Sequence, residues 1–175
     1  MIVVLFILCI ISYNFHNGNV IHNNVFVDRN HSLLNKEMIS KEIVRLQNIS
    51  LKFINELIMD YPRNIVVGRL RNWSGSIREL PFNTQHILAS NTNKGDVISI
   101  CFVNKAGDLN ATNELIWVLL HELAHVMTNE YKHNDYFWEN NKFLVNEAVK
   151  RGLYKFVEYG KQPVKFCGSA ISYNF

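Results

Sequence analysis

Apolar residues recur at helical spacing over a long stretch of the chain, from about Leu33 to Asp60. They return every three or four positions with Lys and Glu between them, a pattern typical of a helix that buries one face. Pro62 cannot continue a helix, so we expect one long helix that ends before it. The apolar positions are Ile39, Ile43, Leu46, Ile49, Phe53, Ile54, Leu57 and Ile58.

A second helix is predicted over about residues 113–129, where the hydrophobic pattern takes another form. Apolar side chains occupy nearly every position instead of one stripe, which predicts a central, buried helix. A third helix is predicted from about residue 136 to residue 151. Asn134 or Asp135 can cap its start, and Gly152 ends it.

Three stretches rich in β-branched and apolar residues predict strands between the first two helices: 64–73, 86–90 and 96–104. The turn residues Asn93, Lys94 and Gly95 precede the last of them. The order of one helix, then strands, then two helices predicts an α+β domain.

The first fifteen residues form an apolar run without a charge. A basic region and a small-residue cleavage site, which a cleaved signal peptide needs, are both missing from it. We therefore expect a membrane anchor or an uncleaved signal anchor at 1–15, with a core strand or a cleaved signal as alternatives. We expect the asparagine-rich residues 16–31 to be a linker and 32–175 to be the folded domain. On this interpretation the protein is associated with a membrane through its N-terminal segment.

Composition narrows the class of protein. The 175 residues suit one domain with a substantial core, and a net charge of +3 is too small to indicate nucleic acid. The chain has three cysteines, and no two of them are spaced as Cys-x-x-Cys: Cys9, Cys101 and Cys167. This excludes a disulfide framework and a cysteine-rich zinc ribbon; we expect reduced thiols, with at most one bridge.

The second predicted helix contains the sequence HELAH, whose side chains can bind a metal ion. His121 and His125 are four residues apart, so both imidazoles lie on one helix face and can bind one metal ion. Glu122 lies near that face, where it can act as general base on a metal-bound water. Burying three ionisable groups in an apolar helix is costly unless they are paired or bind metal. The motif therefore predicts a zinc site.

A catalytic zinc ion needs a third protein ligand and an open position for water. The metzincin class would place glycine at 128 and histidine at 131, where this chain has Thr128 and Tyr131, so that class is excluded. His133 and Glu147 remain as candidates for the third ligand. We favour His133, because a short loop directly after the helix can bring it back to the two helical histidines. Glu147 has other plausible roles, as a solvated carboxylate on a helix or as a hydrogen-bond partner of a ligand histidine.

HELAH, followed by a third histidine and then HNDYFW, resembles the SprT and WLM zinc metalloproteases, the Spartan-like group. The stretch from residue 98 to residue 154, with PVKFCG after it, is most similar to the small, uncharacterised WLM-like metallopeptidases that large DNA viruses encode. The likeness runs from about Trp73 to Phe175. It differs from the yeast-type pattern in a longer connector of seven residues that lacks Gly-Pro, and no Spartan-type zinc finger is visible.

The resemblance implies an α+β zincin-like metallopeptidase domain, with a small mixed sheet packed on the buried helix. It implies Zn²⁺ as cofactor, with His121, His125 and His133 as ligands and Glu122 as general base. It also implies that strand 96–104 is the edge strand beside the cleft, where an extended peptide can add to the sheet.

The function predicted from these features is a zinc metallopeptidase, a hydrolase acting on a peptide or protein substrate. One alternative is a non-catalytic, membrane-anchored zincin-fold binding module, in which Cys167 closes the fourth zinc position. The other is a protease for DNA–protein crosslinks, which would require salt-dependent binding of nucleic acid by the basic C-terminal residues.

Overall fold

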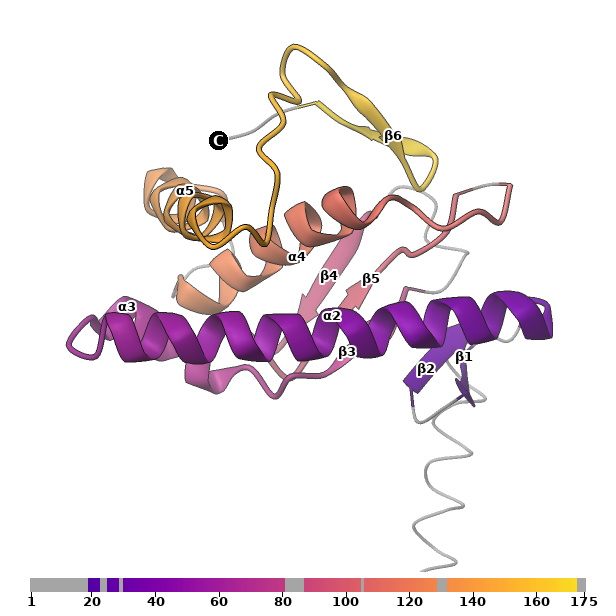
Figure 1. Ribbon diagram of the computed structural model, residues 1–175, viewed down its shortest axis with the longest axis horizontal. Coiled ribbons are helices and arrows are strands. Elements are labelled where there is room, and N and C mark those ends of the chain that lie inside the picture. The colour runs from indigo at the N-terminus through magenta and orange to yellow at the C-terminus, as the bar shows by residue number, and fades with distance from the viewer. Residues whose placement is uncertain are drawn as a thin grey trace, which may run out of the picture.

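The computed structural model describes residues 19–22, 25–28, 30–80, 87–104, 106–128 and 132–172. Helices and short β-sheets form a mixed α+β arrangement, as the order of the predicted elements indicates (Figure 1). The apolar segment 1–15 lies outside the described residues. Among the described residues, no helix is both long and apolar enough to cross a membrane.

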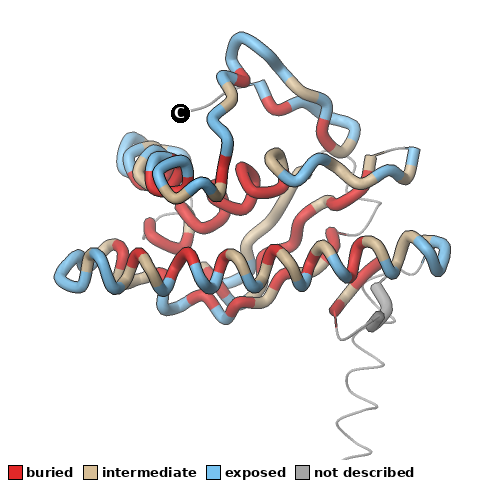
Figure 2. The backbone as a smooth tube through the Cα atoms, viewed as in Figure 1, coloured by how far each residue is buried: buried red, intermediate tan, exposed pale blue. Residues whose placement is uncertain are grey.

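Helix α2 spans Leu33–Asp60, as the periodicity predicts. Ser32 caps its start by accepting a hydrogen bond from the backbone N–H of Asn35. Its buried residues recur along one side, so the helix lies across the molecule with that side toward the core and the other toward solvent (Figure 2). The helix ends at Asp60, directly before Tyr61 and Pro62.

The segment predicted to be a linker contains two paired strands. Strands β1 (Asn19–His22) and β2 (Val25–Asp28) form an antiparallel hairpin that packs on α2. Val25 and Val27 are buried in the core, because residues two apart point to the same face of a strand. The interpretation of 16–31 as an irregular linker is therefore wrong for these residues.

The central sheet is mixed and has the order β3–β5–β4. Strand β3 (Ile77–Glu79) pairs with β5 (Val97–Ile100) in parallel, and β4 (Ala89–Thr92) pairs with β5 antiparallel. The strand expected at the edge, β5, is thus the central one, since it has a partner on both sides. The edge strands are β3 and β4.

Residues 64–73 do not form the predicted strand. They form helix α3 (Ile65–Gly68) and the 3₁₀ helix η1 (Arg69–Asn72). The Asn64 side chain accepts hydrogen bonds from the backbone N–H groups of Val66 and Val67, so a local cap prevails over the β preference of the valines.

Helix α4 (Thr112–Met127) is buried on almost every side, as its composition predicts (Figure 2). It packs against strands β4 and β5 of the sheet and against helix α5 (Asp135–Lys150) (Figure 1). The Asn134 side chain caps α5 by accepting a hydrogen bond from the N–H of Phe137. Because the sheet and α5 enclose α4, its polar side chains are buried at a cost, which makes them candidates for a functional site.

The chain ends in a second hairpin, formed by β6 (Val164–Phe166) and β7 (Ser169–Ile171). A disulfide joins Cys167, in the turn of this hairpin, to Cys101 directly after β5. The expectation of reduced thiols is therefore wrong for these two cysteines. The bridge also contradicts the alternative in which Cys167 serves as a fourth zinc ligand.

Candidate metal centre

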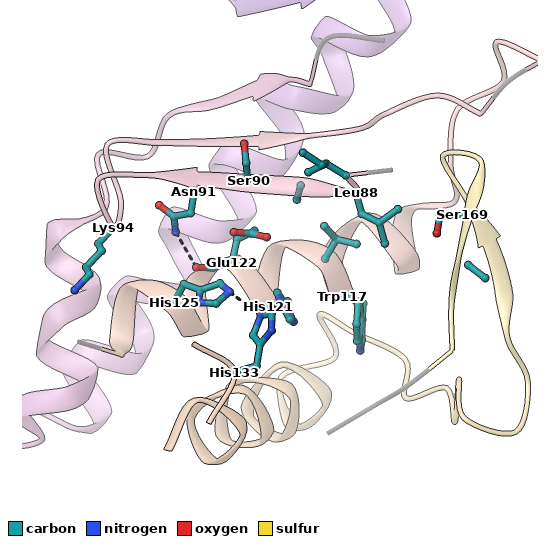
Figure 3. Close-up of a pocket in the computed structure, with 14 residues that line it drawn as sticks. Leu88, Ser90, Asn91, Lys94, Trp117, His121, Glu122, His125, His133 and Ser169 are labelled. Atoms are coloured by element: carbon teal, nitrogen blue, oxygen red, sulfur yellow. Dashed lines mark hydrogen bonds between the residues drawn. The ribbon is translucent and has the colours of Figure 1, made fainter. Parts of the chain in front are cut away.

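Three histidines from two parts of the chain meet beside α4. His121 and His125 lie one turn apart on that helix. His133 lies directly before Asn134, the cap of α5, and its ring points back at the other two (Figure 3). These three residues are named the histidine cluster below, and they are the set of side chains in the described structure whose ligand atoms suit a metal ion.

The ring nitrogens of the histidine cluster have the spacing of metal ligands. The Nε2 atom of His133 lies 3.1 Å from the Nε2 atoms of both His121 and His125. A single Nε2 has either one N–H or one lone pair, so it cannot form a well-directed hydrogen bond to both neighbours at once. Tetrahedral zinc with bonds of about 2.1 Å would hold its nitrogen ligands about 3.4 Å apart. The three donors therefore fit a zinc ion with little adjustment.

The protonation state of these histidines also suits a metal. Burial, and then the proximity of His125 and His133, lowers the pKa of His121 to about 3. Burial and the proximity of His133 lower the pKa of His125 to about 4. Burial also lowers the pKa of His133. The imidazoles are therefore neutral near pH 7, the form in which histidine binds a metal ion.

Glu122 lies beside the histidine cluster, in surroundings that raise the pKa of its carboxyl. Its side chain is 6% exposed, and burial raises the pKa of its carboxyl to about 7. A carboxyl with this pKa both accepts and releases a proton near neutral pH, as a general base and acid must. In Figure 3 Glu122 points into the pocket between α4 and β4.

Aromatic rings from the start of α5 support the histidine cluster. The ring centroid of Phe137 lies 4.4 Å from that of His125 and 4.6 Å from that of His133. Trp138 lies 5.6 Å from His133. Phe137 is fully buried, so this part of HNDYFW packs on the core. Because the rings are packed on one another, the imidazoles have defined orientations.

Glu147, the other candidate for third ligand, is not in the histidine cluster. Its carboxylate accepts hydrogen bonds from the Tyr61 hydroxyl at 3.0 Å and from the Arg151 guanidinium at 2.8 Å. Those partners join α5 to the end of α2. The structure therefore gives Glu147 a role in holding helices together.

A pocket of about 500 Å³ opens beside the histidine cluster and Glu122. Strand β4 and the middle and end of α4 line it, and so does the C-terminal hairpin. Figure 3 shows Lys94 at one end and Ser169 at the other. The lining residues are Ile87, Leu88, Ala89, Ser90, Asn91, Lys94, Trp117, Val118, His121, Glu122, His125, His133, Ser169 and Ala170.

Asn91 is a pocket residue that sequence reasoning missed. Its side-chain amide donates to the backbone carbonyl of Glu122 at 3.0 Å, which ties the edge strand to the histidine helix. The Oδ1 atom of Asn91 is buried and has no hydrogen-bond partner in the described part of the chain. Local sequence carries no signal for this residue, because the contact depends on how the sheet packs on α4.

Comparisons with known proteins found a family model and two relatives. A family model described as the WLM domain matches residues 45–170. An uncharacterized protein of Acanthamoeba polyphaga mimivirus is 34% identical over 79 residues, which cover 45% of this chain and 40% of that protein. An uncharacterized protein of Invertebrate iridescent virus 3 is 45% identical over 42 residues, covering 24% of this chain and 26% of that protein. The aligned part is thus less than half the length of either relative. No solved structure matches the chain. Because the family model covers well over half of its residues, the chain belongs to the WLM domain family.

Proposed function

We propose that this protein is a zinc-dependent metallopeptidase of zincin architecture. The observation that carries the proposal is the convergence of three neutral imidazole nitrogens beside a buried carboxylate, at the edge of a pocket. Membership of the WLM domain family, which is associated with peptidase activity, supports the same conclusion.

The histidine cluster would hold the ion, leaving a position that faces the pocket. A bound zinc ion supplies a water of lowered pKa and polarises the scissile carbonyl. Glu122 would take the proton of the attacking water and return it to the leaving amine, as a general base and then a general acid.

The edge strand β4 would orient the substrate. β4 pairs with β5 along one edge, and β4 has no second strand partner among the described residues. Residues 88–91 line the pocket along this strand. An extended peptide can therefore add to β4 through backbone hydrogen bonds and place one of its carbonyl groups beside the histidine cluster.

The Glu122→Gln variant tests the role of the carboxylate. Gln has nearly the same shape but cannot take up the proton, so zinc content should stay at one ion per chain while cleavage of unfolded casein falls by a factor of about 10²–10⁴. The exposed Glu139 on α5 offers a matched control, since Glu139→Gln should leave both quantities unchanged. Loss of zinc, or full cleavage, in Glu122→Gln would show that Glu122 is not the general base.

The third ligand is tested by zinc content alone. His133→Ala should lose the metal, because two histidines bind zinc far more weakly than three. Glu147→Ala should retain it, since that carboxylate bonds to Tyr61 and Arg151. Metal loss in Glu147→Ala but not in His133→Ala would overturn the assignment.

A further inference from the structure

The two ends of the pocket differ in chemistry. Lys94 lies at one end, in the turn between β4 and β5 (Figure 3). At the other end, next to Ser169, the lining includes the apolar side chains of Leu88, Trp117, Val118 and Ala170. Trp117 and Val118 come from α4, while Ala170 comes from the C-terminal hairpin. Residues from three separate parts of the chain thus form one apolar region, named the apolar end below.

The apolar end lies close to where the reaction would occur. Trp117 precedes His121 by one helical turn, and their ring centroids are 5.8 Å apart. An extended peptide advances about 3.3 Å per residue. A side chain entering the apolar end therefore belongs to a residue one or two positions from the scissile bond.

The hairpin wall of the apolar end is held in a defined position. Phe166 and Ile171 are buried in the core and anchor the two strands. The turn between the strands has positive φ at Cys167 (51°) and Gly168 (80°), a conformation that a residue other than glycine rarely adopts. The disulfide to Cys101 attaches this turn to the end of β5, the strand that pairs with the edge strand β4.

Asn110 reinforces the attachment of the turn. Its side-chain amide lies 3.0 Å from Sγ of Cys167 and 3.3 Å from the carbonyl oxygen of Cys101, to both of which it can donate. The bridge and the amide therefore hold the hairpin and the sheet at a set separation, and the width of the apolar end depends on both.

We propose that the C-terminal hairpin, fastened by the Cys101–Cys167 disulfide, is a specificity wall that selects an apolar side chain next to the scissile bond of an extended peptide substrate. The inference rests on the proposed function, because it assigns the substrate class of the same site. In this proposal the small side chain of Ala170 leaves room for a large apolar side chain of the substrate.

Binding to the Glu122→Gln protein, loaded with zinc, tests the wall without requiring turnover. The probes are two fluorescein-labelled peptides of ten residues built from Ala, Ser and Thr, one with a single central Leu and the other with Ala in its place. Fluorescence anisotropy should show the Leu peptide binding at least about tenfold more tightly, as expected when several carbon atoms enter an apolar pocket.

Two variants identify the wall. Ala170→Trp fills the apolar end and should abolish the preference for Leu. Gln162→Trp is the matched control, because Gln162 is exposed just before the hairpin and does not line the pocket, and it should keep the preference. The double variant Cys101→Ser, Cys167→Ser should reduce the preference while zinc content and far-UV circular dichroism stay unchanged.

The results separate this inference from the proposed function. Equal binding of the two peptides by the Glu122→Gln protein would overturn the wall, and so would an unchanged preference in both Ala170→Trp and the double cysteine variant. A second assay digests a mixed peptide library with the unsubstituted protein. Cleavage with no apolar preference beside the cut sites would refute the wall and leave the peptidase standing. A Leu preference in binding, with no cleavage of the library, would refute the peptidase and leave the wall standing.

Discussion

Removing the Cys101–Cys167 bridge should destabilise the fold by an amount that follows from its position. The bridge joins residues 66 positions apart, so it closes a long loop in the unfolded chain. The chain-entropy relation gives about 4 kcal/mol for a loop of this length, and measured effects of disulfides are typically about 2–4 kcal/mol. In a domain of this size each kcal/mol changes the melting temperature by roughly 2–4 °C.

We therefore expect the Cys101→Ser, Cys167→Ser protein to melt about 4–16 °C below the unsubstituted one. Circular dichroism at increasing temperature measures this difference, and urea unfolding gives the free energy directly. A phosphine reductant should lower the melting temperature of the unsubstituted protein by the same amount and leave the double variant unchanged. Cys9→Ser is the matched control, because it removes the third cysteine and leaves the bridge intact.

Thiol titration decides whether the reasoning holds. The unfolded, unreduced protein should show one free thiol if the bridge is present and three after reduction. If titration confirms that change but the melting temperature moves by less than about 2 °C, the bridge does not stabilise the fold through the unfolded chain as calculated.

Three further predictions concern other parts of the molecule. Thr128→Val should cost about 1–3 kcal/mol in urea unfolding, because the buried hydroxyl accepts a hydrogen bond from Asn140 and Val leaves that amide unpaired; Thr128→Ser should restore most of the loss. The hydrogen bond to Glu79 raises the pKa of His31 above 6.5, so its stabilising effect is complete below pH 6.5 and is lost as the pH rises through the raised pKa. The stability advantage of the unsubstituted protein over His31→Gln should therefore be smaller at pH 9 than at pH 6; an equal advantage would contradict the ion pair. Zinc at 100 times its dissociation constant should stabilise the metal-free protein by about 2.7 kcal/mol, and an equal effect on His133→Ala would show that the stabilising ion binds elsewhere.

The helices could be predicted because their signals are local. Spacing of apolar residues over several turns identifies α2; Asn134 caps the start of α5, and Gly152, with positive φ, follows its C-cap Arg151. The strands were less predictable, since β-branched residues also suit short helices when a side chain such as that of Asn64 caps them. The resemblance implied an edge position for β5, which lies in the centre; strand order depends on pairing between distant segments, which spacing along the chain does not show.

The sequence by itself determined the chemistry on one helix. His121, Glu122 and His125 are separated by at most four residues, so helix geometry alone brings them to adjacent positions. Only the tertiary structure decided the rest. It brought His133 to within 3.1 Å of both other histidines and directed Glu147 to Arg151. It also joined Cys101 to Cys167 and placed the C-terminal hairpin beside the pocket. These contacts depend on how helices and sheet pack around a shared core, and the local sequence does not encode that packing in a form that can be read from spacing.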